Sequence, residues 1–153
     1  NLRPMEIQAS FGLEQIRRLE TMNAHRRANV RHLREAFVAH PRWKGQLSFP
    51  RATEGLDACW FGFPFLVDAK LKLDQRRFTR TLLQLGIDTR PIVSGNMALQ
   101  PALRHLPVDL RQGPFKGAQE IHERGLFIGA HARSVDQDRL VLLVDAVMGA
   151  LEA

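Results

Sequence analysis

A chain of 153 residues, with 44% apolar and 25% charged side chains, has the composition of one globular domain, and this excludes disorder as its dominant state. No apolar run is long enough to cross a bilayer, and the opening residues lack the basic-then-apolar order of a signal peptide. We therefore expect a soluble, cytoplasmic protein without membrane insertion. Cys59 is the single cysteine, which excludes a disulfide within the chain.

The net charge of +6 is compatible with a nucleic acid or an anionic small molecule as partner. Six arginines lie within residues 17–34, but Glu20 interrupts them, Glu14 and Glu35 flank them, and no aromatic residues alternate with them as a base-stacking surface requires. We interpret this segment as the solvated face of a helix and expect no nucleic-acid partner. An anionic small molecule is the alternative that this interpretation leaves open.

The first predicted element is one long helix over residues 1–40, because apolar residues recur there at helical spacing. Pro4 suits its first turn, a bend is expected near Asn23, and the helix should end before Pro41. The rest of the chain is too short to cover such a helix along its whole length. Part of it is therefore expected to pack on something outside this chain.

Residues 41–153 are expected to form a small α/β domain. After a loop with a short extended piece at 46–49, three apolar runs have strand length: 59–67, 87–93 and 126–128. Helices are predicted between and after them: from Asp74 to a stop at Gly86, near 98–105, near 118–124, and from Asp136 onwards. This alternation predicts a two-layer α/β sandwich, with a small, mainly antiparallel sheet of about three strands and helices on one face.

Two features of the predicted sheet follow from the sequence. Pro64 cannot donate a hydrogen bond to a neighbouring strand, so its strand should be at an edge or bulged there. We expect the first two strands to lie side by side and antiparallel, with a parallel crossover as the alternative.

The chain opens on polar and small residues at fixed spacing: Asn1, Arg3, Glu6, Gln8, Ala9, Gly12, Leu13, Gln15 and Leu19, followed by Arg26, Arg27 and Asn29. This pattern resembles the segment of DegT/StrS-type sugar-nucleotide aminotransferases in which the large, cofactor-binding domain leads into the carboxy-terminal small domain. Residues 60–64 (WFGFP) and 89–101 (TRPIVSGNMALQP) resemble the branch that includes the 4-keto-6-deoxyhexose 3-dehydratases. The resemblance implies a carboxy-terminal fragment with the small-domain fold of type I aminotransferases, in which residues 1–40 form an interdomain or dimer-side helix.

The resemblance also implies an activity for the full-length enzyme. It would be a homodimer that uses pyridoxal or pyridoxamine phosphate to transaminate a nucleotide-linked keto-sugar in lipopolysaccharide or related glycan biosynthesis. Deoxygenation at C3 of a 4-keto-6-deoxyhexose is the alternative, and a non-catalytic binding module is a further one. The family's anchoring lysine, or the histidine that replaces it in the dehydratases, is expected upstream. No catalytic residue and no bound cofactor are therefore expected in this chain alone.

Five candidate site residues follow from the resemblance and from their positions. Asn1 and Arg3 are candidates for binding the cofactor phosphate, although Arg3 could instead pair with a neighbouring carboxylate. Arg90 and Asn96 flank a turn after a strand and could contact the substrate, although Gly-Asn is also common turn chemistry. His131, after the last strand, could bind substrate or be a surface histidine. No metal-ligand spacing occurs.

Overall fold

The computed structural model describes residues 3–107 and 113–152. Within these residues the elements follow in the order α1 (Glu6–Ala39), β1 (Leu47–Ser48), β2 (Gly62–Val67), η1 (Ala69–Leu71), α2 (Gln75–Gln84), β3 (Thr89–Pro91), η2 (Met97–Leu99), η3 (Pro101–His105), α3 (Lys116–Arg124), β4 (Gly125–Gly129) and α4 (Gln137–Ala150). None of the described helices combines the length and apolar character that a bilayer span requires. The α/β class predicted from the sequence is confirmed.

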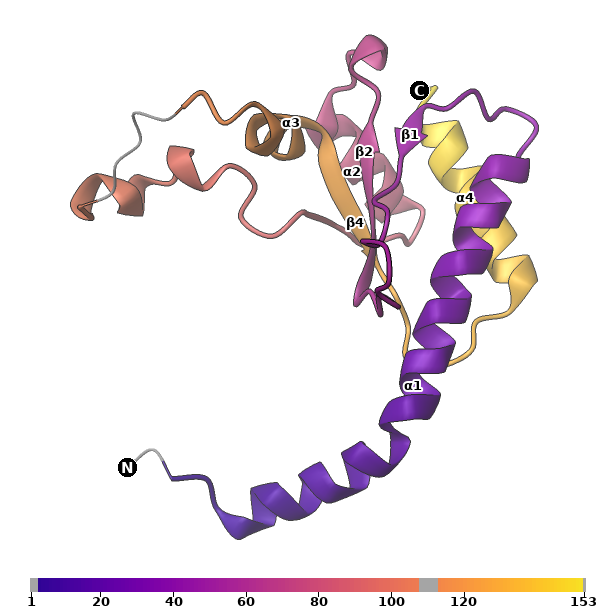
Figure 1. Cartoon of the computed structure of the whole chain (residues 1–153). Coiled ribbons are helices and arrows are strands. Elements are labelled where there is room, and N and C mark those ends of the chain that lie inside the picture. The colour runs from indigo at the N-terminus through magenta and orange to yellow at the C-terminus, as the bar shows by residue number, and fades with distance from the viewer. Residues whose placement is uncertain (1–2, 108–112, 153) are drawn as a thin grey trace.

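Helix α1 is longer than any other described element and extends well beyond the rest of the domain (Figure 1). It begins after Met5, whose backbone N–H donates to Gln8 Oε1 at 2.9 Å, so Pro4 precedes the helix and does not lie in its first turn. It ends before Pro41, as predicted, with the His40 N–H donating to the Phe37 carbonyl. Figure 1 shows the helix bending along its length.

The sheet has four strands in the order β1-β2-β4-β3, and every pair is antiparallel. The predicted pairing of β2 with β3 is wrong, because β4 lies between them and pairs with both. Burial explains this order: β4 provides the buried Leu126 and Ile128, which suit a central strand, whereas Arg90 and Pro91 of β3 are exposed and suit an edge. The short strand β1 raises the count from the predicted three to four.

Pro64 lies in β2, which is not an edge strand, but β1 pairs only with Leu66 and Val67. Beyond the end of β1, one side of β2 has no neighbouring strand. The missing N–H of Pro64 can therefore face this open side without costing a hydrogen bond in the sheet.

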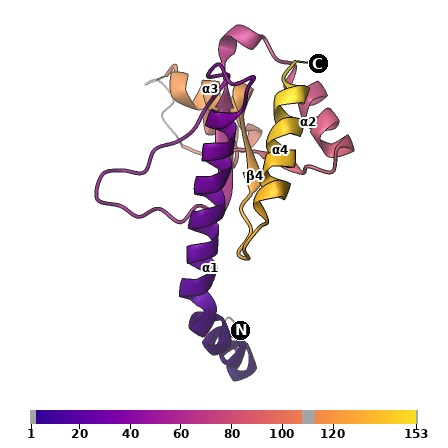
Figure 2. The ribbon, with the colours of Figure 1, turned by 90° about the vertical axis from the view of Figure 1, so that its right-hand side faces the viewer.

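The core lies between one face of the sheet and helices α1, α2 and α4. Figure 2 shows α1 and α4 side by side. Its least exposed large side chains come from all three helices and both central strands: Phe37, Phe65, Phe78, Leu82, Leu126, Val144 and Met148. Asp74 and Asp136 accept hydrogen bonds from backbone N–H groups at the starts of α2 and α4, as predicted for N-caps. Helix α3 lies against β2 and β4 and buries no residue.

Only the C-terminal half of α1 belongs to this core. Its buried residues are Asn29, Leu33 and Phe37. Six apolar side chains nearer the N-terminus are each 45–69% exposed: Met5, Ile7, Phe11, Leu13, Ile16 and Leu19. These six residues are called the exposed stripe of α1 below.

Candidate functional site

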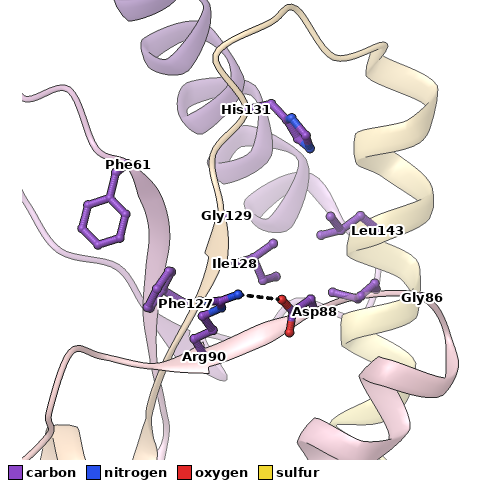
Figure 3. A pocket seen from close by; sticks show the side chains of 10 residues that line it. Phe61, Gly86, Asp88, Arg90, Phe127, Ile128, Gly129, His131 and Leu143 are labelled. Atoms are coloured by element: carbon purple, nitrogen blue, oxygen red, sulfur yellow. Dashed lines mark ion pairs between the residues drawn. The ribbon is translucent and has the colours of Figure 1, made fainter. Parts of the chain in front are cut away.

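A groove of about 550 Å³ opens at the edge of the sheet, where β3 begins and β4 ends (Figure 3). We call it the edge groove. It is lined by the residue before β2, the α2–β3 turn, β3, β4, the β4–α4 loop and α4. These residues are Phe61, Gly86, Ile87, Asp88, Arg90, Phe127, Ile128, Gly129, His131 and Leu143. It therefore brings together two of the predicted substrate residues, Arg90 and His131, which lie 41 positions apart in the sequence.

Arg90 is placed by the edge strand β3, where it pairs in register with Phe127 of β4. Its guanidinium lies 3.5 Å from the Asp88 carboxylate, and the two side chains are 71% and 69% exposed. A pair this exposed is held weakly, because solvent screens both charges. A guanidinium has five N–H donors, so Arg90 can bind an anionic or hydroxyl-bearing ligand at modest cost to this pair.

His131 lies in the loop between β4 and α4, on the other side of the edge groove from Arg90 in Figure 3. The start of this loop is fixed by the Ala130 N–H, which donates to the Phe61 carbonyl at 3.0 Å. The imidazole is exposed and can donate or accept a hydrogen bond. The edge groove therefore presents the Arg90 guanidinium and the His131 imidazole to a ligand, beside the Asp88 carboxylate.

An aromatic pair forms the wall of the edge groove between these polar groups. The rings of Phe61 and Phe127 meet edge to face, with centroids 5.3 Å apart and planes at 76°. Phe127 lies directly over Gly62, since a Cβ there would come within 2.5 Å of the ring. The 63% exposure of Phe61 leaves much of this apolar wall open to a ligand.

Asn96 does not line the edge groove. Its side chain is buried, donating to Gln119 Oε1 at 2.8 Å and accepting from the Ala98 N–H at 3.1 Å. Gly95, next to it, has a φ of +60° and lies against His122. These contacts favour the interpretation that Asn96 stabilises the turn through its side-chain hydrogen bonds. A substrate contact by Asn96 stays a prediction.

The model of the DegT/DnrJ/EryC1/StrS aminotransferase family matches residues 1–148. The chain belongs to this family. GDP-4-keto-6-deoxy-D-mannose 3-dehydratase of Yersinia pseudotuberculosis is 29% identical over 131 residues, which make up 86% of this chain and 32% of that protein. The lipopolysaccharide biosynthesis protein RfbH of Salmonella typhimurium is 32% identical over 101 residues, 66% of this chain and 22% of that protein.

Solved structures of relatives have the same fold. The E. coli GDP-4-keto-6-deoxy-D-mannose-3-dehydratase with bound hydrated PLP has a TM-score of 0.83 and 26% identity over 96% of this chain and 36% of that chain. A further structure of such a dehydratase, with the same TM-score, contains bound GDP-perosamine. The chain therefore spans about a third of the length of these relatives. The predicted small-domain fold of an aminotransferase is confirmed by this likeness.

The described residues fit only part of a pyridoxal phosphate site. Arg3 is a cation suited to a phosphate and precedes α1, whose N-terminal end extends away from the sheet in Figure 1. Asn1, the other predicted phosphate ligand, lies outside the described residues. All four lysines of the chain are exposed, and none lines the edge groove: Lys44, Lys70, Lys72 and Lys116.

Sequence reasoning missed one residue at this site. Asn29 is buried in α1, and its amide makes three hydrogen bonds to the backbone of the loop that contains His131. Asn29 is part of the N-terminal sequence pattern that resembles the aminotransferase family, and this was the one sign in the sequence of a role for it. The pattern alone could not relate it to a loop more than 100 residues away. The described residues contain no group of three or more histidine, cysteine or acidic side chains suited to a metal.

Proposed function

We propose that this chain is the carboxy-terminal part of a cytoplasmic enzyme that uses pyridoxal or pyridoxamine phosphate to act on a nucleotide-linked 4-keto-6-deoxy sugar in glycan biosynthesis. The observation that carries the proposal is the edge groove, which combines Arg90, His131 and an open aromatic wall. Arg90 would donate to diphosphate or sugar oxygens, and His131 would hydrogen-bond a sugar hydroxyl. The cofactor, when bound, supplies the electron sink for the chemistry.

Between the two reactions of the family, we favour deoxygenation at C3. Of the two relatives compared by sequence above, one is named as a 3-dehydratase and the other as a lipopolysaccharide biosynthesis protein. Transamination is the second candidate, because the matching family is an aminotransferase family. The residue at the cofactor-anchoring position of the full-length enzyme would distinguish them: histidine favours the dehydratase and lysine the aminotransferase.

We further propose that the exposed stripe of α1 is buried in the assembled homodimer. At 3.6 residues per turn, Leu13, Ile16 and Leu19 share one face of α1 with the N-cap residue Met5, whereas Ile7 and Phe11 lie on the opposite face. All six are exposed, and exposed apolar surface on this scale is a common sign of an interaction site. Arg3 lies at the same end of α1, so burial of the stripe would place this cation at the interface. Such an arrangement would allow Arg3, and Asn1 before it, to reach a cofactor phosphate in the partner subunit.

The proposed substrate site is tested by titrating GDP-mannose into the ¹⁵N-labelled chain and following the NMR signals of the edge groove. The signals of Arg90 and His131 should shift together. Arg90→Ala should weaken binding about ten- to a hundredfold, because a hydrogen bond to a charged group contributes about 1.5–3 kcal/mol. Arg76→Ala, an exposed arginine outside the groove, is the matched control and should bind as the wild type does.

Shifts confined to residues outside the edge groove would contradict the proposed site. Equal losses of affinity in Arg90→Ala and Arg76→Ala would also contradict it, because they would indicate nonspecific attraction by the net positive charge.

A further inference from the structure

We propose that Asn29 is a positioning residue that holds the loop of residues 130–135 in the conformation that directs His131 into the edge groove. This inference rests on the function proposed for the groove. It adds a residue of α1 to a site whose lining comes from Phe61 before β2, from β3, β4 and α4, and from the α2–β3 and β4–α4 connections.

The side-chain amide of Asn29 makes three hydrogen bonds to the backbone of this loop. Nδ2 donates to the His131 carbonyl at 3.1 Å and to the Arg133 carbonyl at 2.7 Å, while Oδ1 accepts from the Val135 N–H at 3.1 Å. The residue is only 6% exposed. Both amide donors and one acceptor site are therefore used, all on alternate residues of a single loop.

Asn29 can fix this loop because it is itself fixed. Leu33 and Phe37 follow it at four-residue spacing on the same face of α1, and both are buried in the core. Two hydrogen-bonded points hold the ends of the loop. The Ala130 N–H donates to the Phe61 carbonyl where the loop leaves β4, and Asp136 caps α4 at the other end of the loop. Between these points the three bonds to Asn29 hold the backbone, including that of His131.

The geometry requires an amide at this position. An aspartate has nearly the same shape but no N–H donors, so its carboxylate would face the carbonyl oxygens of His131 and Arg133 and repel them. It would keep an acceptor for the Val135 N–H. An alanine would leave all three backbone groups without a partner, and a buried unpaired polar group is costly. Asn29→Asp and Asn29→Ala therefore disturb the loop in two different ways.

The experiment compares the wild-type chain with Asn29→Asp, Asn29→Ala and a control, Leu33→Ala. Leu33 is 5% exposed and lies one turn further along α1, so its truncation destabilises the same helix without removing a bond to the loop. Two quantities are measured for each variant under conditions where circular dichroism shows it folded. They are the hydrogen exchange of the Val135 amide and the affinity for GDP-mannose.

In Asn29→Ala, the Val135 amide should exchange faster by more than the loss of global stability explains. Both Asn29 variants should bind GDP-mannose about two- to tenfold more weakly, the cost of ordering one side chain and its loop on binding. The shift of the His131 signals on binding should shrink in both variants, while that of Arg90 persists. Leu33→Ala should retain the wild-type affinity and both sets of shifts.

The outcomes separate this inference from the proposed function. If the wild-type chain does not bind GDP-mannose, the proposed function fails, and the positioning role fails with it. If the wild type binds and the Asn29 variants bind equally well, only the positioning role is overturned. Equal weakening in Leu33→Ala would overturn it too, since general destabilisation would then explain the effect.

Discussion

Replacing Phe37 by alanine should cost the domain much more stability than replacing Phe11 by alanine, although both residues lie on α1. Phe37 is 0% exposed and Phe11 is 69% exposed. The Phe37 ring stacks on Phe63 at 5.8 Å and contacts Phe49 and Trp43, with centroids 5.6 Å and 6.3 Å away. The same substitution therefore removes the centre of an aromatic cluster at one position and an exposed ring at the other.

The magnitude follows from this difference in burial. Truncating a buried phenylalanine to alanine costs about 3–5 kcal/mol, and the lost aromatic pairs place Phe37 in the upper part of that range. A change at an exposed position is usually within about 0.5 kcal/mol. Since a domain is stable by only about 5–15 kcal/mol, Phe37→Ala removes a large share of the total.

Urea unfolding, followed by circular dichroism and tryptophan fluorescence, measures both variants. The chain has two tryptophans, Trp43 and Trp60. Trp43 stacks with Phe49 in the same cluster, with ring planes at 10°, so its share of the fluorescence reports on this part of the core. A loss of unfolding free energy in Phe37→Ala no larger than that in Phe11→Ala would refute the assignment of the C-terminal half of α1 to the core.

Three further predictions concern a turn, a buried histidine and the cofactor. Gly95→Ala should destabilise the domain, because a φ of +60° disfavours side chains by about 1–2 kcal/mol and the new Cβ would come within 2.5 Å of the His122 ring; thermal unfolding measures the loss. Asp145→Ala should cost about 1–3 kcal/mol in urea unfolding, because it leaves His40 Nε2, on a side chain only 8% exposed, without its acceptor. The chain mixed with pyridoxal phosphate should develop no Schiff-base absorbance that borohydride can trap at a single lysine.

Matched variants control for the two substitutions. Gly55 has a φ of +79° with nothing within 4 Å of a new Cβ, so Gly55→Ala should show the backbone strain alone and cost less than Gly95→Ala. Glu152→Ala removes an exposed ion pair with Arg42 and should cost less than Asp145→Ala. If Gly55→Ala cost more stability than Gly95→Ala, the close contact between residue 95 and His122 would not explain the loss. If Glu152→Ala cost more than Asp145→Ala, the burial of the His40 side chain would not explain it. A trapped Schiff base on one lysine would contradict the expectation that the anchoring residue lies upstream.

The starts of α2 and α4 and the end of α2 were determined by the sequence itself. Asp74 and Asp136 cap α2 and α4 at the predicted positions, and Gly86, with a φ of +80°, ends the helical segment before β3. These signals were sufficient because each involves groups only a few residues apart. The places of Arg90 and His131 next to predicted strands likewise identified them as candidates, although nothing in the sequence related one to the other.

The order of the strands and the composition of the edge groove were decided only by the tertiary structure. Placing β4 between β2 and β3 depends on burying Leu126 and Ile128 against three helices, which no local pattern encodes. The contacts of Asn29 join residues more than 100 positions apart. For α1, apolar spacing is helical throughout, yet only its C-terminal half is buried. Periodicity predicts a face, but what covers that face depends on the rest of the fold.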